Sequence, residues 1–320
     1  MSLAYVYTTV CTEPHSDAVW DICWTAKDNA VVSISADGVI KRWNSTSGQV
    51  MRAVSAHTLG LVSLSVSPDG GRALYNSIDG TTSLWDLEGG AIIGKHESYT
   101  RSGAEPSWSV SLNPKGGTYA ATGGSGNVIV YSAEPETFGE QRTILQSGRG
   151  RFGMRCSHSP DGSRVALSLD SGQIFIFDLA SSALTSTFTS HAMAVRSLSW
   201  SPDSQLLLSA SEDKRLILHD VRTTSTGRPS SGAVASLSGH SSWVLSSDIS
   251  PDGRLALSGS ADKTVKVWDL AARTAVSTIA DTQEVWAVSW QPSSAAASSG
   301  AFVTGGEDGV VRWSKAAGTG

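Results

Sequence analysis

Cysteine and charge are both scarce in this chain of 320 residues, and each shortage narrows what the protein can be. The spacing of its 3 cysteines, Cys11, Cys23 and Cys156, matches neither a disulfide framework nor a metal site. We therefore expect a protein of a reduced, intracellular compartment with no bound metal and no cofactor. Charged residues are only 17% of the chain and hydrophobic residues 40%, which allows a large buried core. The net charge of −5 argues against direct nucleic-acid binding through the overall field.

Long apolar runs are also missing. No stretch approaches the roughly 18 consecutive apolar residues that a membrane-spanning helix needs. The first residues, Met1 to Ala4, carry no basic segment of the kind that opens a signal peptide. The sequence therefore predicts neither a membrane span nor secretion.

Turn residues and short strand-like runs are abundant instead. Residues 239–270 contain three runs rich in branched residues and Trp, separated by two turns. The first turn, 250–253, reads Ser-Pro-Asp-Gly, with Pro and Gly where a four-residue turn favours them. The second, 261–264, contains an Asp that can bond the backbone two residues further on. This pattern predicts an antiparallel meander.

The meander recurs at a constant spacing. His240 and Trp268 are 28 positions apart, as are His15 and Trp43. His57 and Trp85, and His191 and His219, show the same separation. Adding three copies that keep only the closing strand gives seven, which end near residues 43, 85, 131, 177, 219, 268 and 313. A period of about 40 residues that closes on Trp-Asp is typical of WD-repeat propeller blades.

The two chain ends complement each other. Residues 3–10 read as a strand with no hairpin partner, and the last copy ends after its third strand at Trp313. We expect the N-terminal strand to complete the last blade, which would close the ring and cover a free sheet edge. The sequence thus predicts an all-β, seven-bladed propeller in a single domain, 1–320. The segment 95–106 is expected to be a long charged loop leading into the third copy.

His, Ser and Asp recur together and could suggest a hydrolase. The sets are His15, Ser33, Asp37 and Trp43 in the first copy, and His240, Ser258, Asp262 and Trp268 in the sixth. A catalytic triad occurs once, whereas this set belongs to the repeat. We interpret it as a hydrogen-bonded tetrad that locks each blade, and we expect no enzyme activity.

Residues 148–153 match the dinucleotide-binding pattern G-x-G-x-x-G, but a strand follows where that site needs a helix. The match is therefore coincidental. Arg149 and Arg151 in this segment, with Arg142 and Arg155, form a local basic patch that we interpret as solvated charge, with RNA contact as the alternative.

Aligning the copies places bulky apolar residues at equivalent positions near the central channel. The predicted partner-binding residues of this face are Trp20, Trp108, Phe152, Met154, Trp243, Leu245, Trp286 and Arg196. So much aromatic surface exceeds what a monomer normally exposes, and Trp and Met are enriched at interfaces. An adaptor that reads phosphorylated degrons would need several arginines here, and the ring holds only Arg196.

Several segments resemble one particular WD-repeat family. Residues 190–207, 239–245 and 262–269, with Val285-Trp286 and 149–152, are similar to the WD-repeat subunit of the superkiller (Ski) complex. The resemblance implies a non-enzymatic scaffold, cytoplasmic or alternatively nuclear, that binds a tetratricopeptide-repeat subunit and an RNA helicase in exosome-mediated mRNA decay. Nucleic acid would then be contacted only indirectly.

The same resemblance implies two alternative assemblies and one peptide motif. Relatives also serve meiotic recombination and the nuclear Paf transcription complex, and a ubiquitin-ligase-type adaptor is a further alternative. Family members bind peptides of the form Gln-Arg-x-x-hydrophobic. By that analogy the aromatic residues would receive the hydrophobic side chain, and Asp21, Glu284 or Glu307 would receive the Arg.

Overall fold

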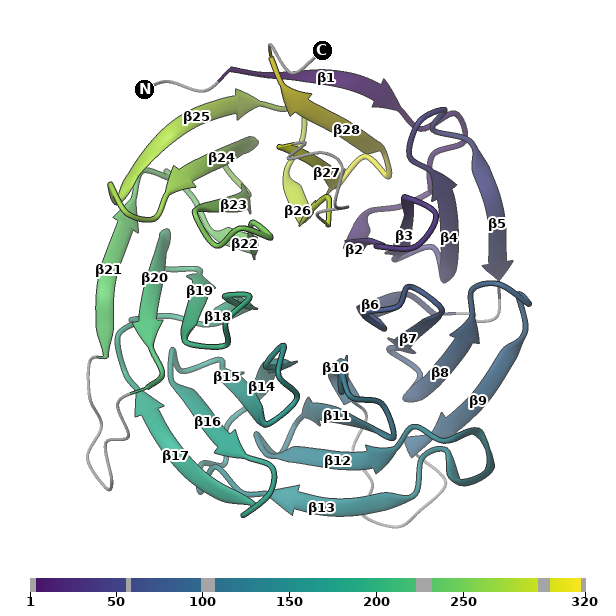
Figure 1. The fold of residues 1–320 in the computed structure, drawn as a ribbon, viewed down its shortest axis with the longest axis vertical. Coiled ribbons are helices and arrows are strands. Elements are labelled where there is room, and N and C mark those ends of the chain that lie inside the picture. The colour runs from purple at the N-terminus through teal and green to yellow at the C-terminus, as the bar shows by residue number, and fades with distance from the viewer. Residues whose placement is uncertain (1–3, 56–58, 99–106, 223–231, 293–299, 318–320) are drawn as a thin grey trace.

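The computed structural model describes residues 4–55, 59–98, 107–222, 232–292 and 300–317. These residues form seven four-stranded antiparallel sheets arranged around a central axis (Figure 1). This is the predicted all-β, seven-bladed propeller. The described residues contain no α-helix, and the one complete helical turn among them is the 3-10 helix η2 (Pro135–Thr137). No helix in the described ranges is long and apolar enough to cross a membrane.

Each blade is one consecutive meander, with its first strand beside the channel and its fourth strand at the rim (Figure 1). The strands of blades 1 to 4 are β2 (Val19–Trp24), β3 (Ala30–Ser35), β4 (Val39–Asn44) and β5 (Val50–Ser55); β6 (Leu61–Val66), β7 (Arg72–Ser77), β8 (Thr81–Asp86) and β9 (Ile92–Glu97); β10 (Ser107–Leu112), β11 (Thr118–Gly123), β12 (Val128–Ser132) and β13 (Gln141–Leu145); β14 (Gly153–His158), β15 (Arg164–Leu169), β16 (Ile174–Asp178) and β17 (Ala183–Phe188).

Blades 5 to 7 follow the same plan, except that the last blade takes its outer strand from the N-terminus. Their strands are β18 (Val195–Trp200), β19 (Leu206–Ser211), β20 (Arg215–Asp220) and β21 (Ala233–Ser238); β22 (Val244–Ile249), β23 (Leu255–Ser260), β24 (Thr264–Asp269) and β25 (Thr274–Ala280); β26 (Val285–Trp290), β27 (Ala301–Gly306), β28 (Val311–Ala316) and β1 (Tyr5–Val10).

The segment 95–106 differs from its interpretation as a loop. Strand β9 continues to Glu97, so Lys95 and Glu97 lie on a strand and form an ion pair of 2.8 Å. Residues 99–106 lie outside the described residues.

The Ser-Pro-Asp-Gly turn of blade 6 shows how local sequence sets the meander. The Ser250 hydroxyl donates to the Asp252 carboxylate at 2.6 Å and accepts the backbone N–H of Leu255 at 2.9 Å. Gly253 has φ of 72°, a left-handed conformation that glycine adopts without strain. The turn therefore reverses the chain between β22 and β23 with its polar groups paired.

The hydrophobic core lies between blades rather than at the centre of the ring. Buried side chains form seven clusters, one for each pair of neighbouring blades. The cluster between blades 7 and 1 contains Trp43 and Trp313, whose ring centroids are 6.4 Å apart. Because every blade buries both faces against its neighbours, the ring must close for all seven clusters to form.

The N-terminal strand provides that closure. Strand β1 pairs with β28 in the register Tyr5↔Ala316 to Val10↔Arg312, with a bulge between Tyr7 and Thr9. The Tyr5 ring packs 5.2 Å from that of Phe302 and 6.4 Å from that of Trp290. The edge of β28 that would otherwise be free is therefore covered, as the sequence predicts.

The repeated polar residues form hydrogen-bonded tetrads. In blade 6, His240 lies 2.8 Å from both Asp262 and Ser258, and the Trp268 indole donates to the Ser258 hydroxyl oxygen at 2.8 Å. In blade 1, His15 lies 3.1 Å from Asp37 and 2.8 Å from Ser33, to which Trp43 donates at 2.8 Å. Blade 5 makes the same connections through His191, Asp213, Ser209 and His219. His219 thus takes the position of the Trp.

Burial lowers the pKa of His240, although its bond to Asp262 acts against that shift. Burial raises the pKa of Asp262, but hydrogen bonds from Thr264, His240 and the Ser241 N–H outweigh it and leave the pKa below its ordinary value. We infer a neutral imidazole that donates from Nδ1 to a carboxylate and accepts the serine proton at Nε2.

Blade 2 lacks the tetrad serine, and its tryptophan shows the consequence. Tyr75 stands at the serine position. The indole N–H of Trp85 is buried and has no hydrogen-bond partner among the described residues. Such a group carries a desolvation cost of about 1–3 kcal/mol.

Removal of residues 1–10 should lower the melting temperature markedly or cause aggregation, because it exposes β28 and takes Tyr5 away from Phe302. Circular dichroism melting with size-exclusion chromatography measures this. Val6→Ala is the control, since Val6 lies on the same strand and is 48% exposed. A monodisperse truncation with an unchanged melting curve would contradict this account of closure.

Trp268→Phe should destabilise the protein more than Trp85→Phe, by about 1–2 kcal/mol. Both changes remove the same volume from buried sites, but only Trp268 makes a hydrogen bond with a described residue. Urea titration gives the two free energies of unfolding. Equal losses, or a larger loss for Trp85→Phe, would show that the tetrad bond contributes nothing.

Candidate functional site

Four aromatic side chains form a continuous row at one mouth of the channel. In order the row contains Trp286, Trp20, Trp108 and Phe152, with successive ring centroids 5.4, 5.8 and 5.7 Å apart. Each residue lies at or just before the start of an inner strand, in blades 7, 1, 3 and 4 respectively. The alignment of the repeats thus places them on one face, and the folded ring brings their side chains into contact. We call them the aromatic row.

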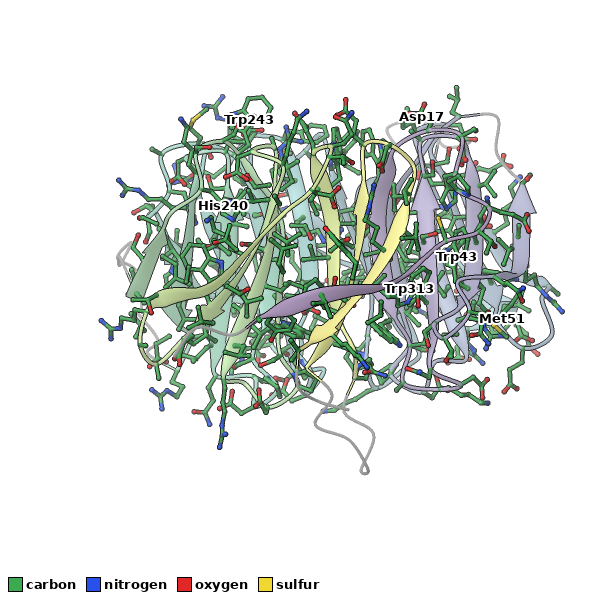
Figure 2. The ribbon with its side chains drawn as sticks, turned by 90° about the horizontal axis from the view of Figure 1, so that it is seen from above. Asp17, Trp43, Met51, His240, Trp243 and Trp313 are labelled. Carbon is green, nitrogen blue, oxygen red and sulfur yellow. The ribbon has the colours of Figure 1, made fainter. Side chains whose placement is uncertain are left out.

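A cavity of about 450 Å³ runs along the channel below and beside the aromatic row. Of the predicted residues, Met154, Arg196, Trp243, Leu245 and Glu284 line it together with three tryptophans of the row. Met154 is only 9% exposed, whereas Trp243 is 43% exposed and lies at one face of the disc (Figure 2).

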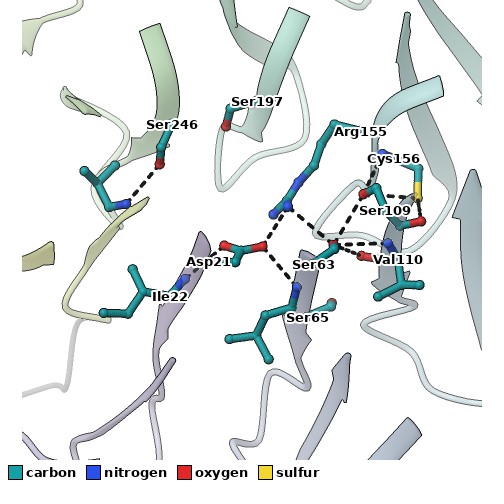
Figure 3. A network of polar contacts seen from close by, with 12 residues as sticks. Asp21, Ile22, Ser63, Ser65, Ser109, Val110, Arg155, Cys156, Ser197 and Ser246 are labelled. Carbon is teal, nitrogen blue, oxygen red and sulfur yellow. Dashed lines mark hydrogen bonds and ion pairs between the residues drawn. The ribbon is translucent and has the colours of Figure 1, made fainter. Parts of the chain in front are cut away.

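Two of the predicted charged residues are already paired. The Arg196 guanidinium contacts the Glu212 carboxylate at 2.5 and 2.7 Å. The Asp21 carboxylate accepts from the Arg155 guanidinium at 2.7 Å across the channel and from the backbone N–H groups of Leu64 and Ile22 at 3.0 Å (Figure 3). Asp21 therefore lies below the mouth with its oxygens occupied. A peptide Arg at Asp21, as the sequence predicts, would have to share this carboxylate with Arg155.

Glu284 and Glu307 are different, because their carboxylates make no hydrogen bond or ion pair with any described residue. Glu284 is half-buried at the cavity wall, two residues before Trp286. Glu307 is exposed, and its backbone N–H donates to the carbonyl of Glu284 at 3.0 Å. The two acids thus stand together at the blade 7 end of the aromatic row.

The indole N–H of Trp286 is a further unsatisfied group. Its Nε1 is buried and has no hydrogen-bond partner in the described part of the chain. Leaving a buried donor unpaired costs about 1–3 kcal/mol. The mouth of the channel therefore combines apolar surface with one buried, unsatisfied donor.

Sequence reasoning missed a set of serine side chains below the mouth. Side-chain oxygens on one inner strand accept backbone N–H groups of the inner strand in the next blade, which links neighbouring blades (Figure 3). The acceptor and donor pairs are Ser63 and Val110, Ser65 and Leu112, Ser109 and Cys156, Ser111 and His158, Ser197 and Ser247, Ser199 and Ile249, Ser246 and Val288, Asp248 and Trp290, and Ser289 and Trp24, at 2.8 to 3.2 Å. The signal was present, since serine alternates along these strands.

Burial shifts the pKa values of the thiols and of a histidine that lie near the channel. Burial raises the pKa of both Cys23 and Cys156 to about 12, so neither thiol ionises near neutrality. Burial lowers the pKa of His158 to about 3, and its Nδ1 lies 3.0 Å from the Ser111 hydroxyl. No group of three or more His, Cys, Asp or Glu among the described residues is placed to hold a metal ion.

Comparison with known proteins identifies the repeat. A sequence profile described as "WD domain, G-beta repeat" matches residues 7–44, 48–86, 182–220 and 232–269. The meiotic recombination protein rec14 of Schizosaccharomyces pombe is 32% identical over 293 residues, which is 90% of each chain.

Two further relatives match over shorter stretches. The WD repeat-containing protein SL1-17 of Schistosoma mansoni is 29% identical over 68% of this chain and 72% of its own length. The WD repeat-containing protein VIP3 of Arabidopsis thaliana is 33% identical over 61% of this chain and 64% of its own.

His158 and Asp248 should give opposite pH dependences of stability. The pKa of His158 falls from 6.5 to about 3 on folding. Its contribution to the free energy of unfolding is therefore complete above pH 6.5 and is lost as the pH falls towards 3. Burial raises the pKa of Asp248 from 3.8 to about 6. Its contribution to the free energy of unfolding is therefore complete below pH 3.8 and is lost as the pH rises towards 6. Between these limits the two effects oppose each other.

Relative to the unsubstituted protein, His158→Gln should lose stability as the pH rises from about 4 to 6, and Asp248→Asn should gain it. Each slope is at most about 1.4 kcal/mol per pH unit. Urea titrations across this range measure both. Two curves parallel to that of the unsubstituted protein would contradict the assignment.

Proposed function

Because the chain belongs to the WD-repeat family of β-propellers, we propose that it is a non-catalytic scaffold that holds a segment of a partner protein across the aromatic row. The observation that carries this proposal is the contact of four aromatic rings at the channel mouth, beside the unpaired N–H of Trp286. Clustered aromatic side chains dominate the energy of many protein interfaces. Family membership supports a binding role over an enzymatic one.

The chemistry of the mouth suits a segment that carries both a cation and an apolar side chain. Glu284 and Glu307 have carboxylates free to receive an Arg, and the rings beside them can cover a hydrophobic group. A segment of the form Gln-Arg-x-x-hydrophobic has both features. Asp21 has no part in this recognition, since Arg155 already occupies it.

The likeness to a meiotic recombination protein supports one choice of assembly. Since rec14 aligns over 90% of both chains, we place a nuclear meiotic recombination assembly, or a Paf-type transcription assembly, first. The residue resemblance described above supports a Ski-like complex, with a tetratricopeptide subunit and an RNA helicase in the cytoplasm, as the second candidate. A phosphodegron adaptor has the least support, because Arg196 is already neutralised by Glu212.

Purification of the tagged protein from its own cells decides between these assemblies. Recovery of tetratricopeptide and helicase subunits would favour the Ski-like complex. Recovery of recombination or transcription proteins would favour the nuclear assemblies.

Trp286→Ala should weaken binding of a Gln-Arg-x-x-Leu peptide about thirtyfold or more, because a central aromatic contact contributes about 2 kcal/mol or more. Fluorescence anisotropy with a labelled peptide measures the affinity, and circular dichroism checks the fold. Met51→Ala on the rim strand β5 is the control, since Met51 is 50% exposed and lies away from the mouth (Figure 2). Unchanged binding by folded Trp286→Ala protein would overturn the assignment of this face.

A further inference from the structure

The aromatic row has opposite charges at its two ends. Its first ring, Trp286, belongs to blade 7, and its last ring, Phe152, belongs to blade 4. The three centroid spacings of 5.4, 5.8 and 5.7 Å set the length of the row. An extended peptide, at about 3.3 Å per residue, would cover that length with about five residues. A segment lying along the row would therefore contact both ends.

The blade 7 end is acidic. Glu284 lines the cavity beside Trp286, and Glu307 is joined to it by a backbone hydrogen bond of 3.0 Å. The arginine on the same blade, Arg312, is engaged by Asp308 at 2.5 Å and Asp281 at 3.7 Å. Within the described residues, no cation neutralises Glu284 or Glu307. This end favours a cationic group of the partner.

The blade 4 end is basic. Arg149 and Arg151 belong to the loop that leads into Phe152, and both are exposed. Arg149 has no ion-pair partner among the described residues, and the guanidinium of Arg151 reaches the Asp170 carboxylate only at 4.0 Å, with 61% of its side chain exposed. This end therefore retains positive charge that a partner can use.

The basic loop is held in place by its neighbours. The backbone N–H of Ser147 donates to the Asn127 side chain at 3.0 Å, and that of Arg149 donates to the Ser147 hydroxyl at 3.2 Å. A Cβ on Gly126 would lie 2.1 Å from the carbonyl oxygen of Arg151, so only glycine allows the loop to approach this turn. A fixed loop presents its arginines with little ordering cost on binding.

Building on the proposed function, we propose that the bound segment carries an Asp or Glu that meets Arg149 and Arg151, beyond the apolar centre that covers the aromatic row. Its cationic side chain lies at Glu284 and Glu307, so the two charged ends fix the direction in which the segment lies. Arg196 does not compete for the acidic residue, because Glu212 occupies it. Two exposed arginines, of which only Arg151 reaches a carboxylate, suit one acidic side chain of the partner.

Four labelled peptide designs test this proposal, each synthesised in both chain directions. They share an Arg and an apolar centre. Their far end is acidic, neutral, basic or phosphoserine. In the better direction, the acidic peptide should bind about three- to tenfold tighter than the neutral one by fluorescence anisotropy. The advantage should shrink with added salt.

The double variant Arg149→Glu/Arg151→Glu should lose this advantage and favour the basic peptide instead. The matched control is Lys115→Glu/Arg254→Glu, which makes the same change in net charge at exposed positions of first-to-second-strand turns, on the opposite face. This control should keep the preference for the acidic peptide.

Equal binding of the acidic and neutral peptides, with Trp286→Ala still weakening both, would overturn the charge proposal and leave the proposed function standing. A gain for the phosphoserine peptide alone would also overturn it, in favour of a phosphorylated partner. If no peptide binds, or if Trp286→Ala changes nothing, both proposals fall.

Discussion

The fold depends on how the inner edge of each blade is satisfied. An inner strand has a β-partner on one side only, so half of its backbone N–H groups point towards the channel without a ladder. Side chains of the preceding blade accept these groups, as Ser63 does for Val110 and Asp248 does for Trp290. This contact sets the spacing between blades and holds their faces close enough to form the seven hydrophobic clusters.

That constraint explains why polar residues that suggest chemistry are so common here. The channel serines bind backbone groups, and the His, Ser and Asp of each tetrad bind one another. Blade 4 departs from the pattern, with Arg155 in place of a serine. Its guanidinium cannot accept an N–H and pairs instead with Asp21 on the far side of the channel (Figure 3). Because arginine replaces serine at this position, an ion pair spans the channel below the mouth.

The candidate site results from the same symmetry. Equivalent positions of the inner strands converge on one mouth of the channel, so bulky residues in blades 7, 1, 3 and 4 meet without any loop being specialised to bring them together. Blade 7 must meet blade 1 for this arrangement, because Trp286 lies on blade 7 and Trp20 on blade 1. Stability and recognition therefore rest on the same ring.

The sequence by itself determined the repeat, the strand order, the closure by residues 3–10 and the members of each tetrad, because these follow from short-range spacing and turn chemistry. It also placed Trp20, Trp108 and Trp286 at equivalent positions. Only the tertiary structure decided which side chains meet. It paired Asp21 with Arg155 and Arg196 with Glu212, and it left Glu284 and Glu307 free. The pairing of Asp21 with Arg155 depends on a distance across the channel between residues 134 positions apart, which no local pattern encodes.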